Sequence, residues 1–201
     1  MEEPGSSIGP EGQAPPPQRL IRLAAIFYGA LLAAALAWGA IAGRPLFYAN
    51  AEAAAQGPDL ARDALVGALA GGIVILLSHE LTRRTRFGEA LARTLASVLG
   101  PLGWGQCVLL ALVSGVAEEA FFRGAIQPHV GLVAASLIFG LAHFAPQREL
   151  WPWTGFSLLA GLLLGFLFEV TGNLTAPIVA HFLINAINLR FLSVRYAPSR
   201  T

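Results

Sequence analysis

The amino-acid sequence predicts an all-α fold, a polytopic transmembrane helical bundle of about six spans with a cavity inside the bundle. Of the 201 residues, 55% are hydrophobic and only 12% are charged. Soluble domains carry about 25% charged residues, so the low charge indicates that lipid is the solvent. The apolar runs are continuous and do not alternate with polar residues, which favours membrane helices over a membrane β-barrel.

The first predicted elements are a tail and two membrane spans. Residues 1–18 are rich in Pro, Gly and Glu and have almost nothing to bury, so we expect a disordered tail. Residues 20–42 form an apolar run that is long enough to cross a bilayer of about 30 Å, and a second run follows at 64–81. Residues 20–82 are therefore expected to hold the N-terminal transmembrane helices.

The second part of the chain, residues 83–195, is expected to form the core of the protein. It opens with the arginine-rich stretch RRTRFGEALAR at 83–93, which predicts an amphipathic helix on the membrane surface. A short C-terminal tail is expected at 196–201. Four further apolar runs predict spans at 94–117, 130–144, 153–170 and 175–194, with a break near Gly100 and Pro101.

The arginines predict the orientation of the chain in the membrane. Clusters of them precede the first span, follow the second and close the last, so with six crossings they lie on one side of the bilayer. The positive-inside rule makes that side the cytoplasm and places both termini there. The net charge of +1 offers no strongly basic face for a phosphate backbone, so nucleic acid is not expected as a partner.

Two adjacent glutamates, Glu118 and Glu119, follow the third apolar run. On a helix, Glu119 and Arg123 lie four residues apart on one face and can form an ion pair, while Glu118 points about 100° away. Ionisable groups at membrane depth cost several kcal/mol unless they are paired or face a cavity, so they indicate function. The alternative is that both glutamates are solvated caps in the headgroup region.

Two histidines extend this set of polar residues. His143 ends the apolar run ASLIFGLAH, and His181 lies four residues before Asn185 on one helix face. Taken singly, a histidine in an apolar segment is commonly a core residue. Together with Glu118, these side chains suit a reaction centre in which a carboxylate takes a proton from water and imidazole and amide groups hold an oxyanion.

Three motifs in a fixed order resemble the signature of a known family. They are Glu118-Glu119-x-x-x-Arg123, Phe139-x-x-x-His143 and His181-x-x-x-Asn185. The chain from about residue 90 to 195 is similar to the type II CAAX prenyl endopeptidase and bacteriocin-processing family of intramembrane proteases, called CPBP or Abi. The resemblance implies an integral, multi-pass protease of a prokaryotic cell membrane. Its partners would be the lipid bilayer and a membrane-anchored protein or peptide substrate, processed at a CAAX-type or related C-terminal or sorting signal.

The resemblance also implies a role for each residue of the motifs. Glu118 and His143 would activate the attacking water. His181 and Asn185 would stabilise the tetrahedral oxyanion. The structural or orienting residues would be Glu119, Arg123 and Phe139.

Zinc is the alternative to metal-free catalysis. Glu118, His143 and His181 could supply one carboxylate and two imidazole ligands with an open position for water. Asn185 is a poor zinc ligand but a good oxyanion donor, and Arg123 places positive charge near the site, so the sequence favours no metal cofactor. The alternative function is a non-catalytic membrane immunity or scaffold protein of the same fold. A proton-coupled transporter is a third reading, and the sequence shows no internal repeat to support it.

Overall fold

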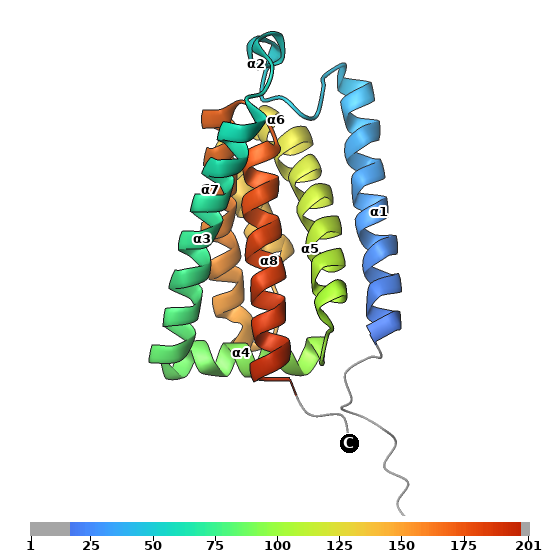
Figure 1. Cartoon of the computed structure of the whole chain (residues 1–201). Helices are drawn as coiled ribbons and strands as arrows, with labels where there is room; N and C mark the ends of the chain where they lie inside the picture. Colours follow the sequence, from blue (N-terminus) through green and yellow to red (C-terminus); the bar gives the residue numbers. More distant parts are fainter. Residues whose placement is uncertain (1–16, 198–201) are drawn as a thin grey trace, which may run out of the picture.

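The helices of the protein stand side by side as a bundle (Figure 1). The structure, a computed structural model, describes residues 17–197, and no strand element occurs in that range. The predicted all-α fold is confirmed. The tails predicted at 1–18 and 196–201 lie mostly outside the described residues, and Pro17 already belongs to the first helix.

The described part of the chain contains both long and short helices. Five helical runs within it are long and apolar enough to cross a membrane. In chain order the elements are α1 (Pro17–Ala42), α2 (Ala51–Gln56), α3 (Leu60–Arg84), α4 (Arg86–Leu99), α5 (Trp104–Glu119), η1 (Ala120–Ile126), α6 (Gln127–Ala142), η2 (Arg148–Leu150), α7 (Trp151–Thr171) and α8 (Thr175–Arg195).

The third long run, Trp104–Ala142, has 39 residues and is not one straight helix. Gly131 inside it has φ 80° and ψ 168°, a backbone conformation that favours glycine. The ring centroids of Phe122 and Phe139 lie 5.0 Å apart, whereas a straight helix would separate these positions by about 25 Å. The run therefore folds back on itself near Gly131.

The returning limb corrects the prediction of a full fourth span at 130–144. Residues 132–142 are helical and cover about 16 Å, which is roughly half of a hydrocarbon core of about 30 Å. The helix ends at His143, which has φ −97° and ψ 8°. The predicted count of six is therefore approximate, because five runs are long enough to span and one of them doubles back.

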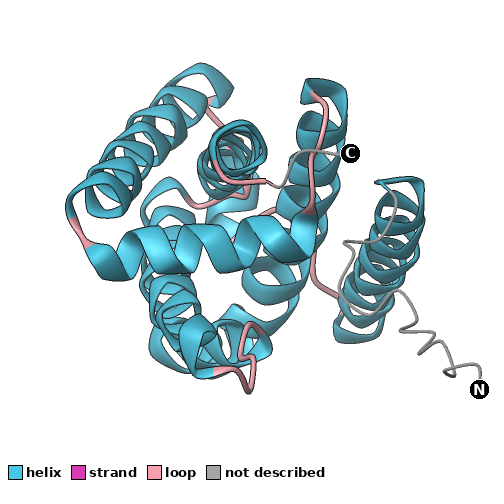
Figure 2. Cartoon of the chain, turned by 90° about the horizontal axis from the view of Figure 1, so that it is seen from below, coloured by secondary structure: helices cyan, strands magenta, loops and turns pink. Residues whose placement is uncertain are grey.

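The position of α4 corrects two predicted boundaries. The amphipathic helix expected at 83–93 covers Arg86–Leu99, and the third span, expected from residue 94, begins at Trp104. Seen from below, α4 lies across the end of the bundle (Figure 2). The first part of the expected third span is therefore surface helix, and the membrane segment is correspondingly shorter.

Local sequence explains where α4 begins and ends. The Thr85 side chain accepts a hydrogen bond from the Gly88 amide at 2.9 Å and caps the first turn. Gly100, with φ 67°, ends the helix directly before Pro101. The break predicted at these two residues is confirmed, and it separates the amphipathic helix α4 from α5.

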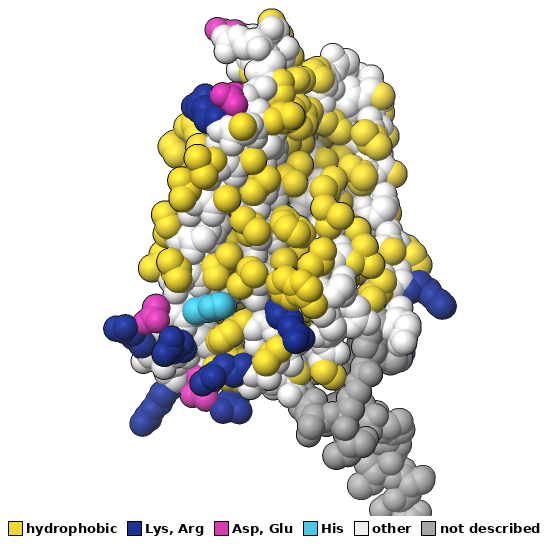
Figure 3. Space-filling model, viewed as in Figure 1, with side chains coloured by type: hydrophobic (Ala, Val, Ile, Leu, Met, Phe, Trp, Pro, Cys, Tyr) yellow, Lys and Arg dark blue, Asp and Glu magenta, His cyan; other side chains and the backbone are white. Residues whose placement is uncertain are grey.

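Charged side chains gather at one end of the molecule, below a broad apolar band (Figure 3). This arginine-rich end carries α4, the start of α1 and the end of α8 (Figure 1). The opposite, outer end carries α2 and the loop before it. This loop is tied to the connection between α7 and α8, because the Ala49 amide donates to the Gly172 carbonyl and the Leu174 amide donates to the Phe47 carbonyl, each at 2.9 Å.

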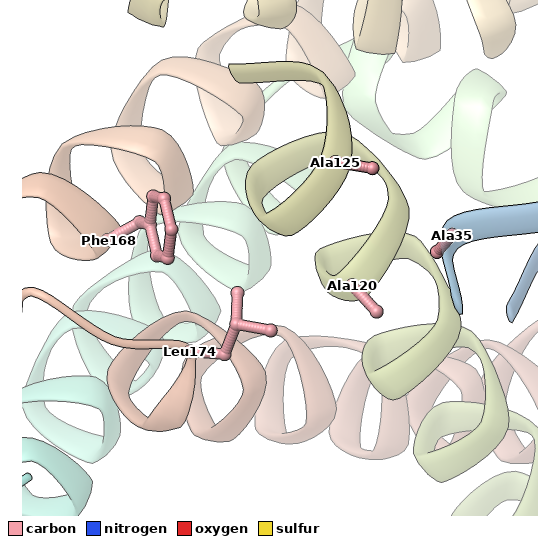
Figure 4. Close-up of a cluster of buried hydrophobic side chains, with 5 residues drawn as sticks. All are labelled: Ala35, Ala120, Ala125, Phe168 and Leu174. Atoms are coloured by element: carbon pink, nitrogen blue, oxygen red, sulfur yellow. The ribbon is translucent and has the colours of Figure 1, made fainter. Parts of the chain in front are cut away.

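A buried apolar cluster near the outer end joins α1 to the rest of the bundle. Ala35 of α1 lies against the small side chains of η1, with α7 and the start of α8 behind them (Figure 4). Small residues allow the helices to approach closely. The members of the cluster are Ala35, Ala120, Ala125, Phe168 and Leu174.

Candidate active site

The fold-back brings the residues of all three motifs to one region inside the bundle. Glu118 and Glu119 form the last turn of α5, His143 caps the short returning helix α6, and His181 lies in α8. Helix α8 packs against α5, and α6 returns beside η1 (Figure 1). Segments that are far apart in the sequence therefore meet around the glutamates.

Glu119 is the centre of a buried ion-pair network. Its Oε2 lies 3.1 Å from Arg123 Nε, and its Oε1 lies 2.6 Å from His181 Nδ1. Arg123 also donates to the Gly161 carbonyl at 3.1 Å, and its guanidinium lies 4.4 Å from the centroid of the Phe139 ring. Glu119 and Arg123 are 0% and 1% exposed, so each charge depends on the other for compensation. The network holds α5, η1 and α8 together and fixes the His181 ring.

The carboxylate of Glu118 has different surroundings. Its Oε2 lies 3.7 Å from His143 Nε2 and 3.9 Å from His181 Nε2, beyond direct hydrogen-bonding distance. Within the described residues this buried oxygen has no hydrogen-bond partner. Separations of this size suit a bridging water molecule. The arrangement can therefore hold one water between a carboxylate and two imidazoles.

The hydrogen bond at the other nitrogen of His143 indicates its tautomer. His143 Nδ1 lies 2.8 Å from the Phe139 carbonyl oxygen, which can only accept a hydrogen bond. The ring proton is therefore assigned to Nδ1 in the neutral imidazole. Nε2, which faces Glu118, is then free to accept a proton.

His181 is held from the opposite side. Its Nδ1 donates to the Glu119 carboxylate, and its Nε2 faces Glu118. With Nδ1 donating to Glu119, Nε2 is a second donor when the ring carries both protons. The two histidines can thus present different chemistry to the same space.

Asn185 lies one helical turn beyond His181. Its Nδ2 donates to Ser114 Oγ at 3.0 Å. This hydrogen bond joins α8 to α5, one helical turn before Glu118. An amide nitrogen carries two protons, and Ser114 uses one of them. The second proton remains available to a group in the cavity.

A cavity of about 400 Å³ adjoins these side chains. Glu118, His143, His181 and Asn185 all line it, so the four residues singled out as catalytic from the sequence open onto one space. The remaining walls are largely apolar, and α4 contributes Leu95, Val98 and Leu99. The cavity therefore extends toward the arginine-rich end.

Comparisons with known proteins cover the part of the chain that holds the site. Residues 100–187 match the model of the family described as type II CAAX prenyl endopeptidase Rce1-like. This stretch, the Rce1-like domain, is similar to that family and makes up less than half of the chain. The uncharacterized protein YpbD of Bacillus subtilis (strain 168) is 44% identical over 93 residues, which cover 44% of this chain and 48% of YpbD. The match thus spans about half the length of that relative, and no solved structure matches the chain significantly.

The Rce1-like domain contains every residue of the three motifs, from Glu118 to Asn185. The family resemblance drawn from those motifs is therefore confirmed, and it is consistent with the CPBP family. Helices α1, α2, α3 and α4 all precede the matched residues. Several of their side chains nevertheless line the cavity or pack against the domain.

Within the Rce1-like domain, the helix changes its winding directly after the two glutamates. Residues Ala120–Ile126 are π-helical, with wider turns than an α-helix. Such turns occur frequently at functional sites. The sequence prediction assumed that Glu119 and Arg123 lie on one α-helix, but the α-helix ends at Glu119. The two residues nevertheless form the predicted ion pair.

Polar residues outside the motifs also line the cavity, among them Ser114 and Tyr28. Ser114 lies four residues before Glu118, and that spacing on an apolar helix could have indicated it. Tyr28 of α1 lines the cavity beside Glu118 and Ser114. Tyr28 lies outside the matched residues, so no pattern near the motifs points to it.

The atoms of the alternative zinc ligands face one point. Zinc bonds of about 2.0–2.1 Å in a tetrahedron place ligand atoms roughly 3.4 Å apart. The two imidazole nitrogens lie 3.7 and 3.9 Å from Glu118 Oε2, a few tenths of an ångström wider. Among residues 17–197, no group of three or more His, Cys, Asp and Glu side chains has the arrangement of a metal site.

Proposed function

We propose that the protein is an intramembrane endopeptidase that hydrolyses a peptide bond of a membrane-anchored protein or peptide. The observation that carries this proposal is the buried, unpartnered Oε2 of Glu118, which faces Nε2 of both His143 and His181 at the cavity wall. A water molecule held there lies between a carboxylate and an imidazole that can accept its proton. The Rce1-like domain supports the reaction class.

In the proposed reaction, Glu118 and His143 take a proton from this water while its oxygen attacks the carbonyl carbon of the substrate. The carbonyl oxygen becomes an oxyanion and accepts hydrogen bonds from His181 Nε2 and Asn185 Nδ2. The carbon–nitrogen bond then breaks. The proton taken from water passes to the leaving amine, which balances the reaction.

The proposed substrate follows from the cavity and from the family description. Largely apolar walls and the amphipathic helix α4 suit a chain segment delivered at the membrane surface. The family model is that of CAAX prenyl endopeptidases. We therefore propose a CAAX-type or related C-terminal or sorting signal as the substrate class.

The test uses the full chain in detergent or lipid vesicles. The probes are a farnesylated peptide that ends in a CAAX sequence and its unfarnesylated counterpart. Wild-type protein is expected to cleave at least one of them, and Glu118→Gln to lower kcat by about a thousandfold because the proton acceptor is lost. Glu52→Gln, the same substitution on the exposed helix α2, is the matched control and should leave kcat unchanged.

Three outcomes decide between the candidate functions. Normal cleavage by Glu118→Gln would overturn the proposed mechanism. If neither probe is cleaved, and new protein termini in host membranes are the same with wild type and Glu118→Gln, the non-catalytic immunity or scaffold function is favoured. Activity that is lost in a chelator and restored by zinc would replace the metal-free mechanism with one in which Glu118, His143 and His181 hold the metal.

A further inference from the structure

Ser114 is a buried polar residue outside the three motifs, and it contacts a residue of the candidate site. It lies in α5 one helical turn before Glu118, lines the cavity and is 4% exposed. A hydroxyl in a largely apolar helix bundle requires hydrogen-bond partners. The direction of the hydrogen bonds that it makes therefore indicates its role.

The two hydrogen bonds of Ser114 run in one direction. Its Oγ lies 3.3 Å from the Ala111 carbonyl oxygen, which can only accept, so the hydroxyl proton is directed there. The same Oγ lies 3.0 Å from Asn185 Nδ2. Because its one proton is given to Ala111, the hydroxyl offers only lone pairs to Asn185. Ser114 is therefore an acceptor for the Asn185 amide.

This direction determines which end of the Asn185 carboxamide faces Ser114. A carboxamide has an NH2 group that donates and an oxygen that accepts, and a rotation of 180° exchanges them. The NH2 group is bound by the serine lone pairs, whereas the amide oxygen in the same place would be repelled. The contact thus holds the carboxamide in one orientation, in which the second Nδ2 proton has a fixed direction.

We infer that Ser114 is a positioning residue for Asn185. The inference rests on the proposed function, in which Asn185 donates a hydrogen bond to the oxyanion. Donors of this kind stabilise a transition state when they are held in place before the charge develops. Ser114 holds the Asn185 donor in this way, although only Asn185 contacts the reacting atoms.

Both oxyanion donors are then anchored by α5. His181 Nδ1 is held by Glu119 and Asn185 Nδ2 is held by Ser114, each across the contact between α5 and α8. The C-terminal end of α5 also carries Glu118. The packing of α5 against α8 therefore fixes the general base relative to both donors.

The first measurement is a double-mutant cycle on the full chain, with cleavage of the peptide probe as the readout. Ser114→Ala removes only the hydroxyl and is expected to lower kcat about tenfold while KM stays within about twofold, because the amide binds the oxyanion of the transition state. Asn185→Ala is expected to lower kcat about a hundredfold. In the Asn185→Ala protein, adding Ser114→Ala should change kcat by less than about twofold, because the serine acts through the amide.

The matched control is Ser97→Ala in α4. The Ser97 hydroxyl also donates to the carbonyl three residues before it, that of Thr94, at 2.8 Å, but Ser97 is exposed and does not line the cavity. Its replacement should leave kcat and KM unchanged. A merely structural role of Ser114 would lower kcat equally with and without the Asn185 amide. That result, or an unchanged kcat in Ser114→Ala, would overturn the inference.

The second measurement does not depend on proteolysis. The chain has four asparagines, at positions 50, 173, 185 and 188, so nuclear magnetic resonance of protein labelled with ¹⁵N only in asparagine resolves few side-chain NH2 groups. Asn185→Ala assigns the Asn185 signals by their loss. In Ser114→Ala, the Asn185 amide protons are expected to exchange with water about fivefold faster, because a hydrogen bond is lost. The Asn173 amide, which donates to Asp63 at 2.7 Å, is the internal reference and should keep its rate.

The inference and the proposed function fail in different ways. An unchanged exchange rate of the Asn185 amide in Ser114→Ala overturns the role of Ser114, even when Glu118→Gln is inactive and the proposed function stands. Normal cleavage by Glu118→Gln overturns the proposed mechanism. The exchange rate then still decides whether Ser114 holds the Asn185 amide.

Discussion

Glu118 and Glu119 are neighbours in α5, yet their carboxylates meet different surroundings. Both oxygens of Glu119 face a nitrogen of Arg123 or His181 within 3.1 Å. Glu118 Oε2 adjoins the cavity, and the nearest histidine nitrogens lie 3.7 and 3.9 Å from it. Successive residues of a helix point about 100° apart. The two adjacent carboxylates therefore have different roles, because Glu119 pairs with Arg123 and His181 and Glu118 adjoins the cavity.

The first prediction concerns stability at these two residues. Glu119→Gln is expected to lower the free energy of unfolding by about 3 kcal/mol, because it leaves Arg123 buried without its counter-charge. Glu118→Gln is expected to change it by less than about 1 kcal/mol, since the nearest histidine nitrogens lie 3.7 and 3.9 Å from Oε2, beyond direct hydrogen-bonding distance. Reversible unfolding of the full chain in mixed micelles, followed by circular dichroism, measures both. Equal losses in the two variants would contradict this division of roles.

At the scale of the elements, the crossing of α3 and α8 depends on glycine. A Cβ atom at Gly67 would overlap the carbonyl oxygen of Ala176, which is backbone and cannot turn aside. One turn away, the buried Asp63 accepts a hydrogen bond from Asn173 at 2.7 Å. Close backbone approach and one buried polar pair therefore fix how these two helices meet.

This crossing gives an element-scale prediction. Gly67→Ala is expected to lower the free energy of unfolding by about 2 kcal/mol, because α3 and α8 must move apart. Gly72→Ala in the same helix has nothing within 4 Å of the new methyl group, so it should be neutral or stabilising by about 0.5 kcal/mol. Unfolding of both variants in mixed micelles tests the pair. A Gly67→Ala protein as stable as Gly72→Ala would show that the helices are not in close contact.

At the scale of the whole molecule, the two ends differ in charge and in access. The arginine-rich end carries the exposed ion pairs of α3 and α4, and the cavity extends toward it. At the outer end, the loop before α2 is hydrogen-bonded to the residues just before α8, whereas none of the residues of this loop lines the cavity. Substrate and water are therefore expected to arrive from the arginine-rich side.

Orientation in the membrane is the prediction at this scale. Cys107 is 0% exposed, so an introduced cysteine supplies the reactive thiol. The positive-inside rule places the arginine-rich end in the cytoplasm, so Ala55→Cys on α2 should react with an impermeant maleimide in intact cells. Arg84→Cys at the end of α3 should react only after the membrane is opened. The reverse pattern of labelling would place the cavity on the other side.

Several properties of the protein follow from the sequence by itself. The membrane environment follows from composition, and the helices follow from continuous apolar runs, because both are local properties of a chain in lipid. The three motifs are also local, and they were sufficient to recognise the family resemblance and to name four of the residues that line the cavity. The boundaries of α4 were less accurate, because its last residues are as apolar as those of a span.

Only the tertiary structure decided how these pieces meet. The fold-back near Gly131 shortens the fourth span and delivers His143 to Glu118, and apolar composition does not distinguish a returning half-span from a crossing one. The π-helical turn after Glu119 depends on packing against neighbouring helices, and no residue pattern marks it. Tyr28 reaches the same cavity from a separate helix. Contacts between residues far apart in the chain are set by three-dimensional packing, so the local sequence around each partner does not reveal them.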